Sequence, residues 1–494
     1  MSAVTGFKRL GYAVAALLLA IFGILGIVSV LIPADQVREA IKAEIRAVTG
    51  LDPVLRGDIS VSLFPYGKVT FADVALGDQA GGTPPLAADR LTTKLRFFPL
   101  LTGRIEVADV ALENPRIALV IGEDGRSNWL PLVASLNRAF GPDANAQRLM
   151  SFSEIRITGG AVSVRDETRN ISERVTDIDM SLAWPAISKS FAATGRVTWR
   201  DEPVDIGVTF GDFAATLRGE RTGLKVRLAG APMKFAFDGT MSARPTLKVD
   251  GALSADAASL RRVVAWTGQR TLPVGGFERF SLKAQTNVVG GTIALTGANL
   301  EIDGNPAEGV LTFATDGRQT LQGTLAADTI DLTPYLSTIR LLTDSEREWS
   351  RLPISLDGLS SFELDLRLSA ARIAIGTAKL GRTAIATNLR GGKLTLTVGE
   401  SRTFGGVIKG SLGLATADAG VEFKSQLQFT DIDLEPTLSE LFGVKRLEGK
   451  GDLAFVLEGT GRNVLALTRT LNGTATLTGR QGALTGLNLE QLLR

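Results

Sequence analysis

The side chains that most often carry out catalysis are missing from this chain, which contains no histidine and no cysteine. A Ser-His-Asp triad, a cysteine nucleophile and a zinc–thiolate site are therefore excluded. Two acid pairs remain, Asp177 with Asp179 and Asp431 with Asp433. On a regular strand, residues two apart point to one side, so each pair could bind calcium or act as acid and base. Asp433 is better explained as the cap of a following helix.

Motifs for phosphate or acyl chemistry are also missing. The chain contains no G-x-x-x-x-G-K, no G-x-S-x-G and no S-x-x-K pattern. The stretch GTGRNV at 459–464 begins like a dinucleotide-binding loop but lacks the third glycine, and we interpret it as a hairpin turn. We therefore expect no enzymatic activity, no catalytic residues, no cofactor and no metal.

Composition indicates a folded protein with many turns. The 494 residues include 44% hydrophobic and 21% charged residues, which is close to ordinary globular usage, and 54 glycines. The 54 Lys and Arg residues nearly balance the 52 Asp and Glu residues. The chain therefore lacks the basic excess of a nucleic-acid-binding protein.

One segment near the N-terminus is long and apolar enough to span a membrane. Residues 10–32 form a run of 23 residues without a charge, which as a helix would be about 34 Å long. No small-residue cleavage site follows, so we expect an uncleaved anchor and not a signal peptide. Its membrane-facing residues include Leu10, Leu17, Ile21, Leu25 and Ile32. The short tail 1–9 is expected in the cytoplasm, with the long remainder translocated.

From residue 57 onward, apolar and polar residues alternate, which is typical of strands with one apolar face. The clearest apolar sets are Val204, Ile206, Val208 and Phe210; Phe362, Leu364, Leu366 and Leu368; Leu394, Leu396 and Val398; and Phe423 and Leu427. If the strand after Val398 pairs as a hairpin, Leu412 and Leu414 join the same face. The expected turns lie at Asp124–Gly125, Asp238–Gly239 and Asp303–Gly304, and at glycine pairs 159–160, 290–291, 391–392 and 405–406.

Helices are few and short in this pattern. We expect them at 35–49, 131–140, 256–266, 334–342, 436–442 and 486–493. These helices cannot cover so much one-sided sheet. Two sheets could face each other as a β-sandwich, one sheet could curl into a barrel or groove, or an apolar ligand could lie along the face.

Both ends of the chain resemble the AsmA family of bacterial envelope proteins. The resemblance rests on IPADQVREAIKAEIRAVTG after the predicted span, on LTTKLRFFPLLTGRIEVADVALENPRIALVIGEDGRSNWL at 91–130, and on LNGTATLTGRQGALTGLNLEQLLR at 471–494. The middle of the chain is similar to the family only in its strand pattern. Family members usually continue past the GLNLEQLL motif, so the resemblance implies a truncated or unusually short member.

The resemblance implies a periplasmic protein anchored in the inner membrane and related to TamB-type bridge-like lipid-transfer proteins. The expected fold is mainly β: a long, curled antiparallel sheet that forms an apolar groove, with one N-terminal transmembrane helix and a few short helices. β-Sandwich domains are the alternative. The expected divisions are a tail (1–9), an anchor (10–32), an AsmA-like N-terminal region (33–150), a β-rich middle (151–345) and an incomplete AsmA-like C-terminal β region (346–494).

Two functions follow from the predicted fold and the resemblance. In the first, the apolar face binds phospholipid acyl chains and supports outer-membrane homeostasis by lipid transfer. The fifteen residues from Val204 to Leu427 named above, Leu412 and Leu414 included, are then candidate walls of the groove. In the second, the protein is a non-enzymatic scaffold or regulator of outer-membrane protein assembly, with envelope proteins as partners. Neither function involves nucleic acid.

Overall fold

The computed structural model describes most of the chain beyond residue 51. The described residues are 39, 42–43, 46, 52–62, 67–77, 84–95, 107–132, 134, 154–168, 170–183, 190–269, 275–335, 343–345, 348–349, 351, 353–354, 360, 362–376, 378–418, 420–442, 447–480 and 482–483. They divide into two compact units, Met1–Ala231 with Asp238–Pro245, and Pro232–Phe237 with Thr246–Arg494.

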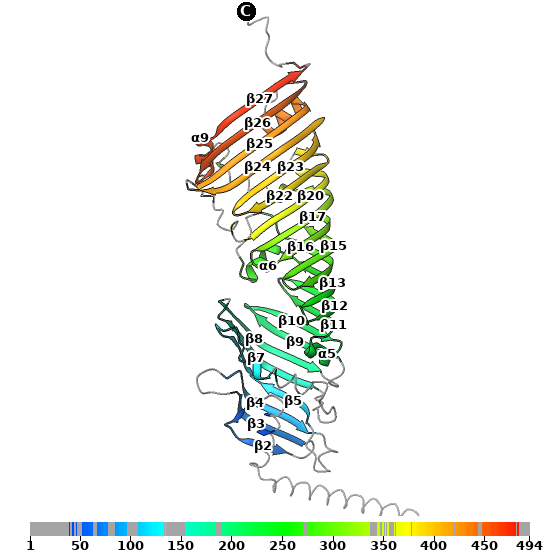
Figure 1. Cartoon of the computed structure of the whole chain (residues 1–494), viewed down its shortest axis with the longest axis vertical. Coiled ribbons are helices and arrows are strands. Elements are labelled where there is room, and N and C mark those ends of the chain that lie inside the picture. Colours follow the sequence, from blue (N-terminus) through cyan, green and yellow to red (C-terminus); the bar gives the residue numbers. More distant parts are fainter. Residues whose placement is uncertain are drawn as a thin grey trace, which may run out of the picture. The chain divides into compact units, whose positions relative to one another are not determined.

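The described residues of the N-terminal unit are mostly in strands, with the short helix α5 between two of them (Figure 1). Its strands are β1 (Pro53–Leu55), β2 (Ile59–Ser62), β3 (Gly67–Leu76), β4 (Leu86–Leu95), β5 (Val107–Glu113), β6 (Arg116–Ile121), β7 (Glu154–Asp166), β8 (Ile171–Ala183), β9 (Phe191–Trp199), β10 (Glu202–Phe210) and β11 (Thr222–Gly230). Helix α5 (Phe213–Arg218) joins β10 to β11, and β12 (Lys234–Ser242) contributes residues to both units.

The C-terminal unit repeats the pattern of long strands and short helices. Its strands are β13 (Lys248–Ala257), β14 (Phe280–Val289), β15 (Thr292–Ile302), β16 (Asn305–Ala314), β17 (Gln319–Asp331), β18 (Thr343–Ser345), β19 (Glu348–Trp349), β20 (Phe362–Ile375), β21 (Ala378–Leu380), β22 (Thr383–Arg390), β23 (Lys393–Thr403), β24 (Gly406–Ala417), β25 (Gly420–Asp433), β26 (Lys450–Gly461) and β27 (Asn472–Arg480). Its helices are α6 (Leu260–Trp266), η2 (Thr333–Tyr335), α8 (Leu434–Phe442) and α9 (Val464–Thr470).

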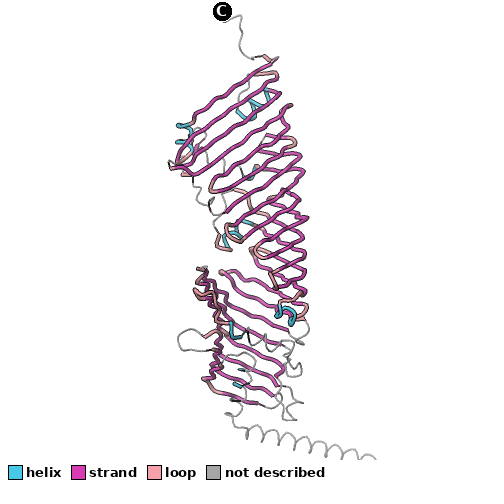
Figure 2. Tube along the Cα trace, viewed as in Figure 1, coloured by secondary structure: helices cyan, strands magenta, loops and turns pink. Residues whose placement is uncertain are grey.

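The protein is mainly β, as predicted, and Figure 2 shows how few helical turns accompany the strands. Apart from the β18–β19 hairpin, the described strands belong to one sheet of 25 strands. The sheet is mixed, however, so the expectation of a purely antiparallel sheet is wrong. β5 and β6 each pair parallel with β7, and β17 pairs parallel with β20. Long connections precede β7 and β20, and parallel pairing needs such connections.

Several predicted turns are confirmed. The pairs 290–291, 303–304 and 391–392 each link two adjacent strands in the C-terminal unit. Asp303 and Gly304 both have positive φ, at 54° and 79°, which is the geometry of the tightest hairpin turns. The turn expected at 405–406 falls one residue earlier, at Phe404 and Gly405.

Two predicted turns are wrong. Asp238 and Gly239 lie inside β12, and the glycine pair 159–160 lies inside β7. The β7–β8 register shifts between Ile157 and Gly160, and Gly159 has a φ of 63°. This glycine pair therefore forms a β-bulge, which shares with a turn the need for a residue at positive φ.

The predicted helices are partly reproduced. α6 lies within the predicted range 256–266, and α8 overlaps the predicted range 436–442. Of the predicted range 334–342, only the part in η2 is described. Residues 39, 42–43 and 46 are helical, as are 130–132. The predicted helix at 486–493 and the predicted anchor at 10–32 lie outside the described residues. Within the part of the chain that the structure describes, no helix is long and apolar enough to cross a membrane.

Helix α8 allows a test of which side chains stabilise the core of the C-terminal unit. Leu434 is fully buried in a cluster with Ile432 and Phe429. Replacing it with alanine should lower the free energy of unfolding by about 2–5 kcal/mol, because the site loses a large buried side chain and keeps the cavity. Urea unfolding of the full chain, followed by circular dichroism, measures the change.

Val456→Ala is the matched control, since Val456 is 49% exposed on the neighbouring strand β26. Its effect should stay below about 1 kcal/mol. Equal effects of the two substitutions would contradict the assignment of Leu434 to the core.

Candidate functional site: an uncovered apolar face

Strands β20 to β26 align their apolar residues in rows across the sheet. One row joins Leu364, Leu389, Leu394, Leu414 and Phe423 through successive Cα partners. The next row joins Leu366, Thr387, Leu396, Leu412, Ser425 and Leu457, and a third joins Leu368, Ile385, Val398, Gly410, Leu427 and Phe455. The sequence-predicted residues of this unit thus share one face, including Leu412 and Leu414 in the expected hairpin.

A similar face exists in the N-terminal unit. Val204, Ile206, Val208 and Phe210 on β10 oppose Gly230, Leu228, Val226 and Leu224 on β11. On the other side they oppose Val197, Gly195, Ala193 and Phe191 on β9. The predicted set on β10 therefore lies together, and the structure assigns it to a different unit from the sets on β20 to β25.

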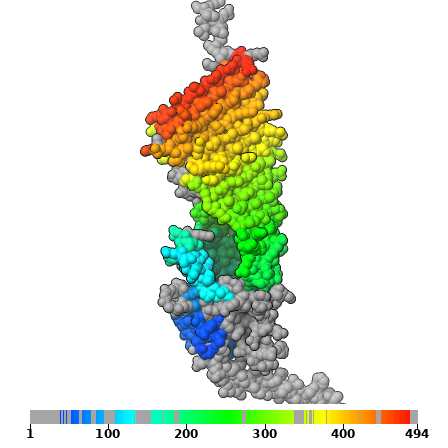
Figure 3. Space-filling model, in the orientation of Figure 1, coloured from blue at the N-terminus to red at the C-terminus, as the bar shows by residue number. Residues whose placement is uncertain are grey.

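Among the described residues, no second sheet lies over the apolar face of strands β23 to β26, although Leu389 of β22 is buried. Leu394, Leu396, Leu412, Leu414 and Leu427 are only half-buried. Every substantial contact between described strands joins neighbours in the sheet, so these leucines pack sideways against adjacent strands. A β-sandwich core would bury them fully between two sheets. Figure 3 shows the residues of this unit in bands that follow the chain order, from green to red.

At one end of the strands the apolar face is closed by α8. Leu434 and Leu438 of the helix pack on Ile408, Phe429 and Leu453 of the sheet. Gly451 on β26 faces the helix, and a Cβ at this position would lie 3.0 Å from a Leu434 methyl group. The same Cβ would lie 2.5 Å from the Thr478 carbonyl oxygen of β27, so a side chain at this position would displace both neighbours, and glycine lets α8 lie close to the sheet.

Helix α9 lies at the other end of the same strand and on the same face. A Cβ on Gly461 would lie 2.5 Å from the Leu467 backbone nitrogen, and one on Gly459 would lie 3.1 Å from the Leu467 carbonyl oxygen. Asn463 caps the helix by accepting a hydrogen bond from the Ala466 N–H at 2.8 Å. Between the two helices, Leu453, Phe455 and Leu457 form a strip of β26 about 26 Å long from Gly451 to Gly459 at about 3.3 Å per residue.

Helix α9 was not predicted from the sequence. The interpretation of GTGRNV at 459–464 as a hairpin turn is wrong. Residues 459–461 end β26, and the segment leads into the helix through the Asn463 cap. Helix α5 was missed in the same way, although Asp212 accepts the Ala215 N–H and Gly219 ends the helix at positive φ. In both cases the signal was a single capping residue before a short helix.

Buried hydroxyl groups interrupt the apolar face. The Ser425 side chain has 4% exposure, and its oxygen has no hydrogen-bond partner among the described residues. Thr383 and Ser401 are also buried, but their hydroxyl oxygens lie 2.8 Å apart, and Thr383 donates to the Gly381 carbonyl. Ser401 therefore donates a hydrogen bond to Thr383. Both hydroxyl groups of this pair have hydrogen-bond partners, whereas that of Ser425 has none among the described residues.

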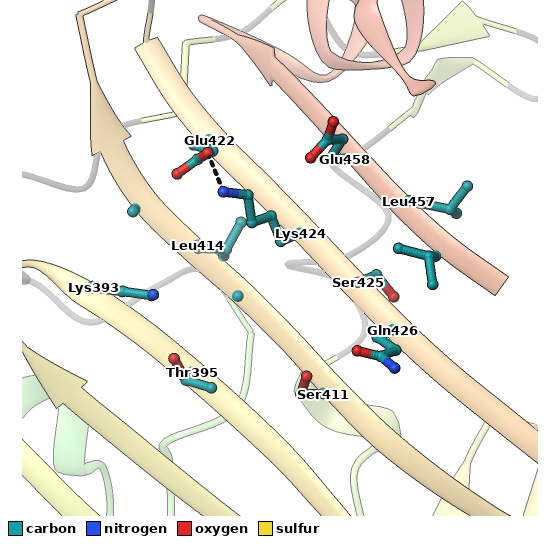
Figure 4. A pocket seen from close by; sticks show the side chains of 13 residues that line it. Lys393, Thr395, Ser411, Leu414, Glu422, Lys424, Ser425, Gln426, Leu457 and Glu458 are labelled. Atoms are coloured by element: carbon teal, nitrogen blue, oxygen red, sulfur yellow. Dashed lines mark ion pairs between the residues drawn. The ribbon is translucent and has the colours of Figure 1, made fainter. Parts of the chain in front are cut away.

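The opposite face of the same strands is polar. It carries a shallow hollow of about 300 Å³, seen from close by in Figure 4. Polar side chains that line it include Lys393, Thr395, Ser411, Glu422, Lys424, Gln426 and Glu458. Glu422 and Lys424 form an ion pair at 2.7 Å, and this hydrogen bond lowers the pKa of Glu422. Gly413, Ala415, Leu414, Val456 and Leu457 also line the hollow, so its lining is mixed in character.

The two acid pairs do not form sites. The strand register shifts between Thr176 and Asp179, and again between Phe429 and Ile432, so each pair includes a bulge. Asp179 accepts the Gly159 N–H at 2.8 Å, and Asp431 lies 3.6 Å from the Lys450 ammonium. The bulges break the alternation that would place both carboxylates on one side. Among the described residues, no group of three or more acids could hold a metal ion.

In the described part of the chain, strands β23 to β26 have one polar face and one apolar face that no second sheet covers between α8 and α9. The chain belongs to the AsmA family, whose model matches residues 5–299 and 343–494. Comparisons with curated proteins and with solved structures give no match.

The buried hydroxyl groups of Ser425 and Ser401 predict opposite effects of an alanine substitution on the free energy of unfolding. Ser425→Ala should raise the free energy of unfolding by about 1 kcal/mol or more, because it removes a buried polar group that lacks a partner. Ser401→Ala should lower it by about 1 kcal/mol, because Thr383 loses the hydrogen bond that Ser401 donates. Urea unfolding of both variants beside the unmodified chain tests the pair. A loss of stability in Ser425→Ala would contradict the reading of Ser425 as unsatisfied.

Proposed function

We propose that this AsmA-family chain is a lipid-binding and lipid-transfer protein that supports outer-membrane homeostasis. In this proposal residues 10–32 anchor it in the inner membrane and the bulk of the chain lies in the periplasm. Phospholipid acyl chains lie along the apolar face, with their headgroups in water at its open side. The protein performs no chemical reaction.

The observation that supports this proposal most directly is the uncovered row of leucines from β20 to β26. Soluble monomers rarely leave contiguous apolar patches larger than a few hundred Å² exposed, and larger patches usually mark a binding surface. A face that continues over neighbouring strands matches an elongated apolar ligand better than a compact one. Membership of the AsmA family is consistent with a role in envelope and lipid homeostasis.

The physical chemistry of such a face suits movement as well as binding. Burial of each methylene group contributes about 0.8 kcal/mol, so a chain of several carbons is held firmly. The interaction has no directional requirement, so an acyl chain can shift along the rows without breaking specific bonds. Helices α8 and α9 stand at the two ends of β26 and would confine the chain between them. Movement in this scheme follows the gradient of lipid.

Adjacent residues of β23 allow a matched test of binding. A photoreactive amino acid at position 396 should form adducts with copurified phospholipid, because Leu396 lies on the apolar face. The same amino acid at position 397 should not, because Thr397 is exposed on the opposite face. Mass spectrometry of the irradiated full-length protein reads out both. Equal labelling at the two positions, or none at 396, would contradict binding on this face.

A charged residue at position 396 tests how much the apolar face contributes to the free energy of lipid binding. Leu396→Asp should lower the amount of copurified phospholipid about tenfold, because a penalty of about 1.4 kcal/mol already has that effect. Thr397→Asp should leave the amount unchanged. Circular dichroism should show that both variants keep their strands, since Leu396 is only half-buried.

The same variants discriminate the scaffold function. If the protein were a scaffold whose apolar face is closed by a second sheet, the unmodified chain would carry no phospholipid. Leu396→Asp would then unfold the sheet. Lipid in the unmodified chain together with a folded Leu396→Asp variant is the outcome that separates the two functions.

A further inference from the structure

Two buried hydroxyl groups of the C-terminal unit lack a hydrogen-bond partner. They belong to Thr286 on β14 and Ser425 on β25, which are only 6% and 4% exposed. Among the described residues, no other buried side-chain nitrogen or oxygen is without a partner. A buried hydroxyl that makes no hydrogen bond costs free energy, so these two require an explanation.

The strand pairing places both hydroxyl groups in one row across the sheet, which we call the central row. From β14 to β20 its members are Thr286, Leu295, Leu311, Gly323 and Leu366, joined through successive Cα partners. Leu366 then leads through Thr387 and the leucines of β23 and β24 to Ser425. Thr387 is half-buried and adds a third hydroxyl group to the central row.

The rows on the two sides of the central row carry no hydroxyl group. The row of Leu364 extends back to β14 through Leu321, Phe313, Ile293 and Val288. The row of Leu368 extends back to β16 through Leu325 and Gly309. Toward β25 these two rows continue with the apolar residues given above. The hydroxyl groups therefore form a polar line between two apolar rows.

This pattern matches a ligand that is apolar on two sides and carries hydrogen-bond acceptors between them. A diacyl glycerolipid has this chemistry, because ester carbonyl oxygens accept hydrogen bonds where its two acyl chains join the glycerol. A free fatty acid is a poorer match. Its carboxylate would need a cation, and the described members of the three rows include neither lysine nor arginine.

We propose that the central row binds the ester carbonyl groups of two-chain glycerolipids, with Thr286, Thr387 and Ser425 as the hydrogen-bond donors. The inference rests on the proposed function and names the class of lipid that the apolar face selects. The acyl chains lie along the two apolar rows, and the unpaired hydroxyl groups gain their partner when lipid binds. Thr286 and Ser425 are eight strand spacings apart, about 38 Å along the sheet, so they belong to separate binding positions.

The hydroxyl group of Ser425 is reached from above the apolar face. Leu412 and Leu457, its Cα partners on the two sides, are half-buried and have longer side chains than serine. A rotamer change in these leucines opens the space above the hydroxyl, and partly exposed side chains make such changes rapidly. Lipid can therefore reach Ser425 while the strands stay paired.

A choice between ester and ether lipids tests the proposal. The full-length protein is incubated with vesicles that contain equal amounts of a diacyl phosphatidylethanolamine and the dialkyl ether lipid with the same headgroup and chain length. The protein is then separated from the vesicles, and mass spectrometry measures the bound lipid. The ether lipid has no carbonyl group, so the diacyl lipid should be bound in about fivefold excess, as expected for one additional hydrogen bond.

Removal of the donors should abolish this preference and keep lipid binding. A variant with Thr286→Val, Thr387→Val and Ser425→Ala keeps both apolar rows and should bind the two lipids in about equal amounts. Ser401→Ala is the matched control, because the Ser401 hydroxyl is buried but already bonded to that of Thr383. This control should keep the preference of the unmodified chain, and circular dichroism should show that both variants keep their strands.

The outcomes separate the proposal from the function on which it rests. Equal binding of the two lipids by the unmodified chain would overturn the proposal and leave lipid binding intact, with water as the partner of the hydroxyl groups. A preference that persists in the triple variant would overturn it as well. Binding of neither lipid would overturn both the proposal and the proposed function.

Discussion

The sheet of the C-terminal unit depends on one constraint: between helices α8 and α9, the described strands β23 to β26 pack their apolar side chains mainly against neighbours in the same layer. In a sandwich or a helix-covered sheet, a leucine at the middle of a strand loses nearly all of its exposure. Here Leu396 and Leu412 face each other across the β23–β24 pair and stay half-buried. Hydrogen bonding between strands and sideways packing therefore hold the sheet, and the apolar surface that remains is a property of the fold.

The alternation of residues was sufficient to predict which side chains share a face. Leu394, Leu396 and Val398 oppose Leu414, Leu412 and Gly410 in a register that the 403–406 turn sets together with a shift between Val398 and Ser401. The parallel pairing of β17 with β20 could not be predicted, because it joins residues separated by a long connection that carries no periodic signal. Bulges were equally hidden, since Gly159 looks the same in a sequence whether it bends a strand or ends one.

The helices show a different limit. Their positions depend on what the sheet allows to approach, so α8 and α9 sit where Gly451, Gly459 and Gly461 leave space for them. The sequence contains these glycines, but strand glycines have several explanations. The candidate residues were thus found from periodicity alone. Of the two helices that border them, α8 was predicted at 436–442, and α9 became visible only when the strands were placed side by side.

The hairpin connections have a consequence for how such a chain can change in length. From β22 to β27 the strand order follows the chain order, and each strand contacts its neighbours and little else. Insertion or loss of a hairpin would move the following strands by two strand spacings, about 10 Å, without repacking a central core. Duplication of one hairpin is therefore a small evolutionary step in this fold, and relatives can differ in reach while every strand keeps the same environment.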